Sequence, residues 1–274
     1  MWAVWTVFKH TGIQFFAFFG VFVIGGALLT LLSRWTNNVF KQFVFPNFGM
    51  YAFGIIGVPF HELCHAFFCK LFLHEVTSVK WFDAQGKGGS HGAVEHLYDP
   101  WNLYHRIGHF FIGLGPVLLS PLLLAVLFYV LVPDARPVLK STLAGWDGML
   151  AIAKGFYGVL VAKKTLTSPG FYLFIYLAVS ISSQMELSRE DLKQAAQGVL
   201  PLLFLILIVN TVAALFNFKI HGPLERTGFT VFAIGACFFL LAGLLATFNL
   251  ALCTALMAGI NKICGREGIN PFRA

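Results

Sequence analysis

His61 and His65 stand four positions apart, and Glu62 directly follows the first of them. Residues four apart lie on one face of a helix, so the two imidazoles can close on a single metal ion. Glu62 lies about a hundred degrees round the helix from His61, beside the ion without having to bind it. The spacing therefore predicts a metal site with a carboxylate next to it.

Two imidazoles and one further protein ligand leave a coordination position on a zinc ion for a water molecule. Zinc lowers the pKa of this water from about 15.7 to about 7, and a neighbouring carboxylate can take its proton and pass it to a leaving amine. Hydrolysis of a peptide bond requires residues of these types. We expect one Zn²⁺ ion per chain, bound by His61 and His65, with Glu62 as the general base.

The motif lies within an apolar stretch, since the residues of 54–60 before it and 66–68 after it are almost all apolar. Ionisable side chains are costly in a membrane and are functional by default. The alternative is a set of buried histidines that bond only to the backbone or to water. The location therefore favours a functional site within a membrane helix.

The composition indicates a membrane protein. Of the 274 residues, 58% are hydrophobic and 11% are charged, which is too little charge to cover the surface of a soluble domain. Several apolar runs reach the ~20 residues needed to cross a hydrocarbon core of roughly 30 Å. The formal charge of +7 suits anionic lipid headgroups, whereas the basic residues form no patch that would indicate nucleic acid.

We therefore expect an all-α polytopic bundle of about six transmembrane helices, forming a single domain over residues 1–274. The expected segments are Phe15 to Leu32, Tyr51 to Phe72, Phe110 to Val132, Phe171 to Ile181, Val199 to Phe216 and Phe229 to Ile260. The second segment carries the histidine motif. The fourth is too short to span alone, and the last is long enough for one tilted helix or two closely joined ones.

Two stretches between these segments have patterns of their own. Residues 76–98 are polar, begin and end with β-type residues, and are typical of a small β-hairpin at the membrane interface. This stretch contains four glycines: Gly86, Gly88, Gly89 and Gly92. Residues 139–160 place apolar side chains at alternating steps of four and three, which predicts one amphipathic interfacial helix.

The run Gly57 to Ala66, with the sequence GVPFHELCHA, resembles the HExxH helix of the site-2-protease-like intramembrane metalloproteases. A glycine-rich hairpin region, a Gly-Leu-Gly-Pro sequence at 113–116 and a later helix ending in an acidic residue follow in the same order. The resemblance spans roughly Gly54 to Asp191, and the HExxH helix is its specific part. It implies a zinc peptidase that cuts a transmembrane or membrane-proximal segment of another protein.

In that family an Asp on a later helix is the third zinc ligand, carried in an Asn-x-x-Pro…Asp-Gly pattern that this chain lacks. Asp191 is our first candidate, from its position after the short fourth segment, with Glu186 second and Glu190 as a further possibility. The same stretch is also typical of a helix N-terminus, because Ser188 can cap it and two acids follow in the first turn.

Other histidines leave further hypotheses open. His105 and His109 form a second pair that could hold another metal ion, share the first, or lie at the interface. His74, His91 and His96 flank or lie in the hairpin, where they could touch substrate or only water. A membrane di-iron hydroxylase or desaturase is therefore an alternative, as is a non-catalytic metal-binding membrane protein, in which Glu62→Gln would be silent.

Overall fold

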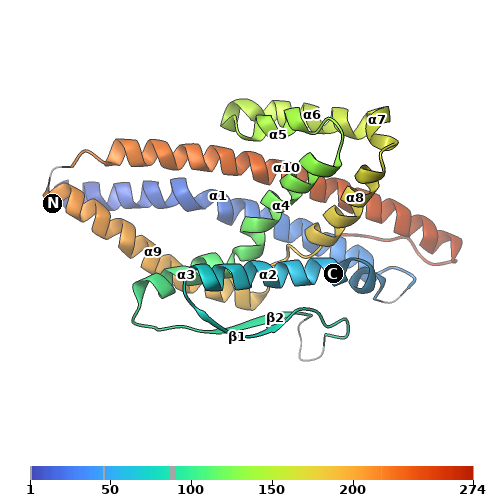
Figure 1. Cartoon of the computed structure of the whole chain (residues 1–274), viewed down its shortest axis with the longest axis horizontal. Helices are drawn as coiled ribbons and strands as arrows, with labels where there is room; N and C mark the ends of the chain where they lie inside the picture. Colours follow the sequence, from blue (N-terminus) through green and yellow to red (C-terminus); the bar gives the residue numbers. More distant parts are fainter. Residues whose placement is uncertain (1, 46, 87–90, 217, 274) are drawn as a thin grey trace.

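The computed structural model of the chain describes residues 2–45, 47–86, 91–216 and 218–273. Two long helices, α1 (Trp2–Lys41) and α10 (His221–Ile263), pack along each other. A third, α9 (Arg189–Leu215), runs from the middle of the molecule to the end where α1 and α10 begin (Figure 1). These three helices form the frame against which the shorter elements lie.

The histidine motif lies on α2 (Ile55–Leu71), which follows a π-helical turn, Met50–Gly54. This helix packs against α3 (Leu103–Gly113), α4 (Gly115–Leu131) and α8 (Pro169–Ser182). Side chains from α1, α4 and α10 fill the core beside these helices, and they include the fully buried Leu29, Leu124 and Leu245. The motif is thus held among four helices rather than on a free end.

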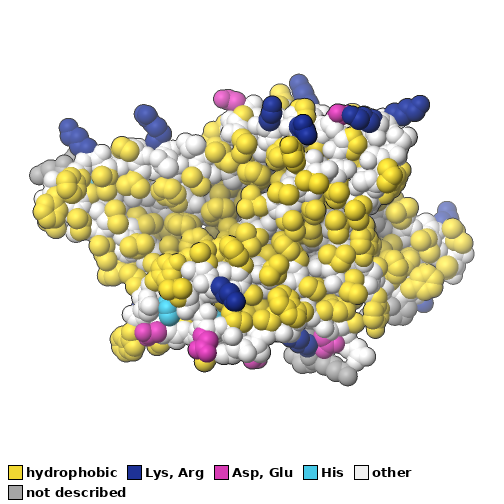
Figure 2. Space-filling view, in the orientation of Figure 1, with side chains coloured by type: hydrophobic (Ala, Val, Ile, Leu, Met, Phe, Trp, Pro, Cys, Tyr) yellow, Lys and Arg dark blue, Asp and Glu magenta, His cyan; other side chains and the backbone are white. Residues whose placement is uncertain are grey.

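Among the residues that the structure describes, four helices are long and apolar enough to cross a membrane: residues 5–41, 50–71, 189–215 and 221–263. The bent pair α3 and α4 passes the same test as a fifth span, while α8 is apolar but short. Hydrophobic side chains cover most of the face in Figure 2, with charged ones mainly at its rims. The chain is therefore a helical membrane protein, and its described residues contain four helices that could span a membrane, or five with the bent pair, whereas the sequence predicts six.

The third predicted segment, Phe110 to Val132, is not one straight helix, since α3 and α4 meet at Leu114 with a bend of 56°. The cause is Pro116, which has no N–H to donate to the carbonyl of Ile112 and whose ring crowds that carbonyl. The last predicted segment, in contrast, is one continuous helix, α10. Two joined helices, the other possibility for this segment, are excluded.

Between α2 and α3 the chain forms a two-stranded antiparallel sheet of β1 (Glu75–Lys80) and β2 (Ala93–Leu97), with a bulge between Val76 and Ser78. The sheet lies where the sequence predicted a hairpin, on the α2 and α3 side of the molecule (Figure 1). Of the glycines predicted to shape it, Gly88 and Gly89 lie outside the described residues.

The prediction of one amphipathic helix over 139–160 is wrong. The structure has α5 (Arg136–Thr142), a 3-10 turn (Gly145–Gly148), α6 (Met149–Val161) and a short α7 (Lys163–Leu166). Gly145 adopts φ +63°, a left-handed conformation that ends a right-handed helix. The predicted apolar face points outward, with Leu150 and Tyr157 exposed, while α6 buries Ile152 against the bundle.

Candidate metal centre

The structure brings His61, His65 and Asp191 together. Nε2 of His65 lies 3.4 Å from Oδ1 of Asp191, and Nε2 of His61 lies 3.8 Å from its Oδ2. Each of the three residues offers one ligand atom, and these three atoms lie within 4.8 Å of one another, so the group could hold a metal ion. Asp191 is thus the acid that meets the histidines, although it lies 126 positions beyond His65 in the chain.

The other two acidic candidates lie elsewhere. Glu186 accepts a hydrogen bond from Nε of Arg34 at 3.0 Å, on α1. Glu190 is exposed and pairs with Lys193 at 2.7 Å on the outer face of α9. Neither belongs to the histidine group, so Asp191 is the third ligand that the geometry favours.

Both histidines are fixed through their second ring nitrogen. Nδ1 of His65 donates to the carbonyl of Ile112 at 2.7 Å, and Nδ1 of His61 donates to the carbonyl of Gln184 at 2.6 Å. A backbone carbonyl can only accept, so each neutral ring carries its proton on Nδ1 and presents the lone pair of Nε2 toward Asp191. This is the tautomer that a metal ligand needs.

The sequence explains why these two carbonyls are available. The helical donor for Ile112 would be residue 116, which is a proline, so the bend between α3 and α4 frees the carbonyl that His65 uses. Gln184 lies just beyond the end of α8, where carbonyls lack helical partners. Ser33 on α1 donates to the carbonyl of Ser183 at 2.7 Å and fixes this segment in place.

Close backbone packing brings these elements to the motif. A Cβ added to Gly57 on α2 would lie 2.1 Å from the carbonyl oxygen of Ser180 on α8. A Cβ added to Gly113 on α3 would lie 2.4 Å from the carbonyl oxygen of Asp191. No side chain fits at either point, so glycine lets α8 and the start of α9 approach the face of α2 that carries the two histidines.

Asp191 also belongs to the N-terminal cap of α9. Its backbone N–H donates to Oγ of Ser188 at 3.1 Å, and its Oδ2 accepts from the N–H of Ser188 at 2.7 Å, which is a capping box. The capping function predicted for Ser188 and the ligand function predicted for Asp191 are therefore compatible. The cap orients the carboxylate and leaves Oδ1 directed at His65.

Glu62 is buried beside His61, and the charges of both His61 and Asp191 act on its carboxylate. The segment leading into β2 covers it. A Cβ added to Gly92 would lie 2.5 Å from Oε1 of Glu62 and 2.8 Å from Val58. The sequence pattern marked Gly92 as a hairpin residue but gave no sign that its backbone would rest on the carboxylate.

His105 and His109 do not join the first group. They lie with His74 and His96, at the junction of the sheet and α3. His91 is exposed, with Nδ1 bonded to the carbonyl of Asp83 at 2.8 Å. The hypothesis that the second pair shares the first ion is therefore wrong.

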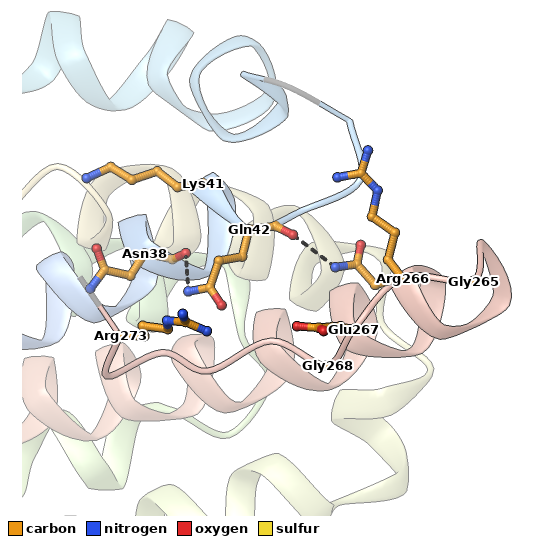
Figure 3. A pocket seen from close by; sticks show the side chains of 9 residues that line it. Asn38, Lys41, Gln42, Gly265, Arg266, Glu267, Gly268 and Arg273 are labelled. Atoms are coloured by element: carbon orange, nitrogen blue, oxygen red, sulfur yellow. Dashed lines mark hydrogen bonds between the residues drawn. The ribbon is translucent and has the colours of Figure 1, made fainter.

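A polar pocket of about 620 Å³ lies at the ends of α1 and α10, away from the histidines. Figure 3 shows that two of its cationic side chains, Lys41 and Arg266, extend away from each other rather than toward a common ligand. Gln42 and Asn261 tie the two helices together there, with Nδ2 of Asn261 donating to the carbonyl of Gln42 at 2.9 Å. We assign this pocket a packing role.

His61 and His65 on α2 and Asp191 on α9 accordingly form a group of side chains that could hold a metal ion, with the buried carboxylate of Glu62 next to it. No protein-family model, curated protein or solved structure matches this chain.

Proposed function

We propose that the chain is a membrane-embedded zinc peptidase, which cleaves a transmembrane or membrane-proximal segment of another membrane protein. The observation that carries the proposal is the His61, His65 and Asp191 group with Glu62 buried at its side. Two imidazole nitrogens and one carboxylate oxygen are a ligand set that zinc accepts in hydrolytic sites, with a fourth position left for water.

The donor set fits the ion in a second respect. The far nitrogens of both rings are bonded to carbonyls, and one oxygen of Asp191 is bonded to the cap of α9. Such outer contacts orient metal ligands and set their tautomer. When bound there, zinc would acidify a water molecule and polarise the carbonyl to be cut.

The chain's own residues account for the remaining steps. Glu62 would take the proton from the attacking water and deliver it to the leaving amine, since its carboxylate adjoins His61 and is shielded from bulk water by the Gly92 backbone. Val58 and Gly92 would exclude further water from the same side. Glu62 thus serves as general base and then as general acid.

A helical substrate hides its scissile amide within its own hydrogen bonds and must unwind before it is cut. The segment at Gly92 to Val94 leads from Glu62 into β2, so an unwound substrate strand added alongside it would pass the carboxylate. Deletion of the hairpin is expected to abolish cleavage, and a deletion variant that still cuts would refute this step.

Metal content and cleavage, measured together, test the proposal. Relative to purified wild-type protein, His65→Ala and Asp191→Ala should each lose one equivalent of zinc, and Glu186→Ala should lose none. Glu62→Gln should retain the zinc yet lose about 10³-fold in cleavage of tagged transmembrane segments in proteoliposomes. Equal cleavage by wild type and Glu62→Gln would favour the non-catalytic hypothesis, and two irons per chain would favour the di-iron one.

A further inference from the structure

A second group of histidines lies outside the proposed zinc site, and it draws on three different elements. His74 follows α2, His96 lies in β2, and His109 lies in α3. The ring centroid of His74 lies 4.8 Å from that of His96 and 5.2 Å from that of His109. Tyr98 packs on this group, 4.3 Å from His109 and stacked on His74 at 5.4 Å. The chain thus gathers three imidazoles under an aromatic cover.

His74 and His96 already place two possible ligand atoms close together. Nδ1 of His74 and Nδ1 of His96 are 3.0 Å apart, close to the separation of two nitrogens bound to one tetrahedral ion at about 2.0–2.1 Å. Nε2 of His74 donates to the carbonyl of His105 at 3.0 Å, and Nε2 of His96 lies 2.7 Å from the side-chain amide of Gln194. The amide N–H of Gln194 donates to Nε2 of His96, so His96 carries its proton on Nδ1 and donates it to Nδ1 of His74. An ion bound by both Nδ1 atoms would take the place of that proton, which would move to Nε2 of His96 and be accepted by the oxygen of the turned Gln194 amide.

In both groups, two histidine rings are held by a hydrogen bond through one ring nitrogen, but the nitrogen that is held differs between the groups. In the first group the rings are bonded through Nδ1 and present Nε2, whereas here they are bonded through Nε2 and present Nδ1. Imidazoles that are fixed by such outer contacts are prepared to bind a metal.

His109 supplies the independent observation. It is only 4% exposed, and neither of its ring nitrogens has a hydrogen-bond partner among the described residues. A buried imidazole without any partner is costly, and a bound ion or a buried water would satisfy it. The ring stands edge-on to His74, and its centroid lies 6.1 Å from that of His96. Among the described residues only His61, His65 and Asp191 already have their ligand atoms within 4.8 Å of one another, so the three rings here would draw closer on binding an ion.

We propose that His74, His96 and His109 form a second metal site, which takes a divalent transition metal such as Zn²⁺, Co²⁺ or Ni²⁺. Imidazole donors suit these ions, whereas Mg²⁺ and Ca²⁺ prefer oxygen. The ion would join the end of α2, the strand β2 and the helix α3. Because β2 begins next to Gly92, which covers Glu62, the ion fastens the hairpin above the first site. This inference does not depend on the peptidase proposal.

Stoichiometry tests the second site. Full-length protein stripped with a chelator and kept in detergent is titrated with Co²⁺, and the bound equivalents are read from the visible spectrum. Wild type should bind two ions, His65→Ala one, His96→Gln or His109→Gln one, and the double variant His65→Ala with His96→Gln none. His91→Gln, an exposed hairpin histidine, is the matched control and should bind two.

The result that overturns the proposal is a wild type that binds a single ion, lost with His65→Ala and retained with His96→Gln. The histidines would then form only a hydrogen-bond chain from α9 to α3. Two ions retained in both His96→Gln and His109→Gln would also overturn it. Since a buried substitution can unfold the chain, each variant is compared with wild type by circular dichroism and size exclusion. The His65→Ala protein, which keeps the cluster intact, must still bind one ion.

Discussion

The two histidine groups of this chain share one construction and differ in charge. In both, each of two imidazoles is fixed through one ring nitrogen, by a backbone carbonyl or an amide, and presents the other. The first group adds the carboxylates of Asp191 and Glu62. Among the described residues, the hydrogen bonds of the second involve imidazoles, a backbone carbonyl and an amide, and no carboxylate.

This difference separates two kinds of chemistry. A buried carboxylate beside an open metal position can move protons between a water molecule and a leaving group, which is what hydrolysis requires. In the second group the three imidazoles would all be occupied as ligands, so none of them is left free beside the ion to move a proton. We therefore expect changes in the first group to alter turnover, and changes in the second to alter how firmly the hairpin is held.

The largest expected effect follows from removing the shared carboxylate. Asp191→Ala should abolish ion binding at the first group and leave the second group loaded, because its oxygens face His61, His65 and the N–H of Ser188 and none of the histidines of the second group. Co²⁺ titration of the variant measures this.

Ser188→Ala is the matched control, since it removes the hydrogen bond of the cap and keeps the ligand. It should retain the first ion and lower the free energy of unfolding by about 1 kcal/mol. If Ser188→Ala lost the ion while Asp191→Ala kept it, the carboxylate would be only a cap.

The second prediction concerns the contact between the hairpin and the base. Gly92→Ala places a methyl group 2.5 Å from Oε1 of Glu62, so the carboxylate must move or the segment must lift. A displacement of about 1 Å costs on the order of 10²-fold in rate, and cleavage should fall by that amount with both ions retained.

The control for this contact is Gly158→Ala, where an added Cβ meets nothing within 4 Å. It should leave cleavage unchanged. Equal rates for the two variants in proteoliposomes would show that the Gly92 backbone does not position Glu62.

Much of the first group could be predicted from the sequence because a helix fixes it. The spacing of His61, Glu62 and His65 needs only the helical period, and the position of Asp191 after a short apolar segment indicated the acid that lies beside the two histidines. The carbonyls of Ile112 and Gln184 could not be assigned, because their use depends on how α3 and α8 pack on α2. Pro116 was the available signal for one of them.

The second histidine group and the points where helices end are harder to predict from the sequence, for a physical reason. His74, His96 and His109 come from three elements, and no period in the sequence relates them. His105 and His109 were recognised as a pair, yet His105 contributes its backbone carbonyl rather than its ring to His74. The apolar pattern over 139–160 predicts one helix, but Gly145 adopts a left-handed conformation that interrupts it.

The third prediction tests the outer contact of the first group. Pro116→Ala restores an N–H that competes with His65 for the carbonyl of Ile112. Loss of such an outer contact lowers metal affinity by about tenfold. A competition titration with a chromophoric chelator, in the His96→Gln background, reads the first site alone.

Pro121→Ala is the matched control, because it lies in the same helix, and the carbonyl four residues before it, that of Val117, receives no histidine hydrogen bond among the described residues. Its affinity should equal that of the parent. An equal loss in both variants would attribute the effect to the helix as a whole rather than to His65.

The smallest expected effect belongs to the corresponding contact of the second group. Gln194→Leu keeps the size of the side chain but removes the amide that lies 2.7 Å from Nε2 of His96. In the His65→Ala background, where only the second site binds, Co²⁺ affinity should fall by up to about tenfold. Gln197→Leu, an exposed change on the same helix, should leave the affinity unaltered. Since Gln194 stands one turn beyond Asp191 on α9, a matching loss at the first site in Gln194→Leu alone would mean that the two groups act as one coupled unit.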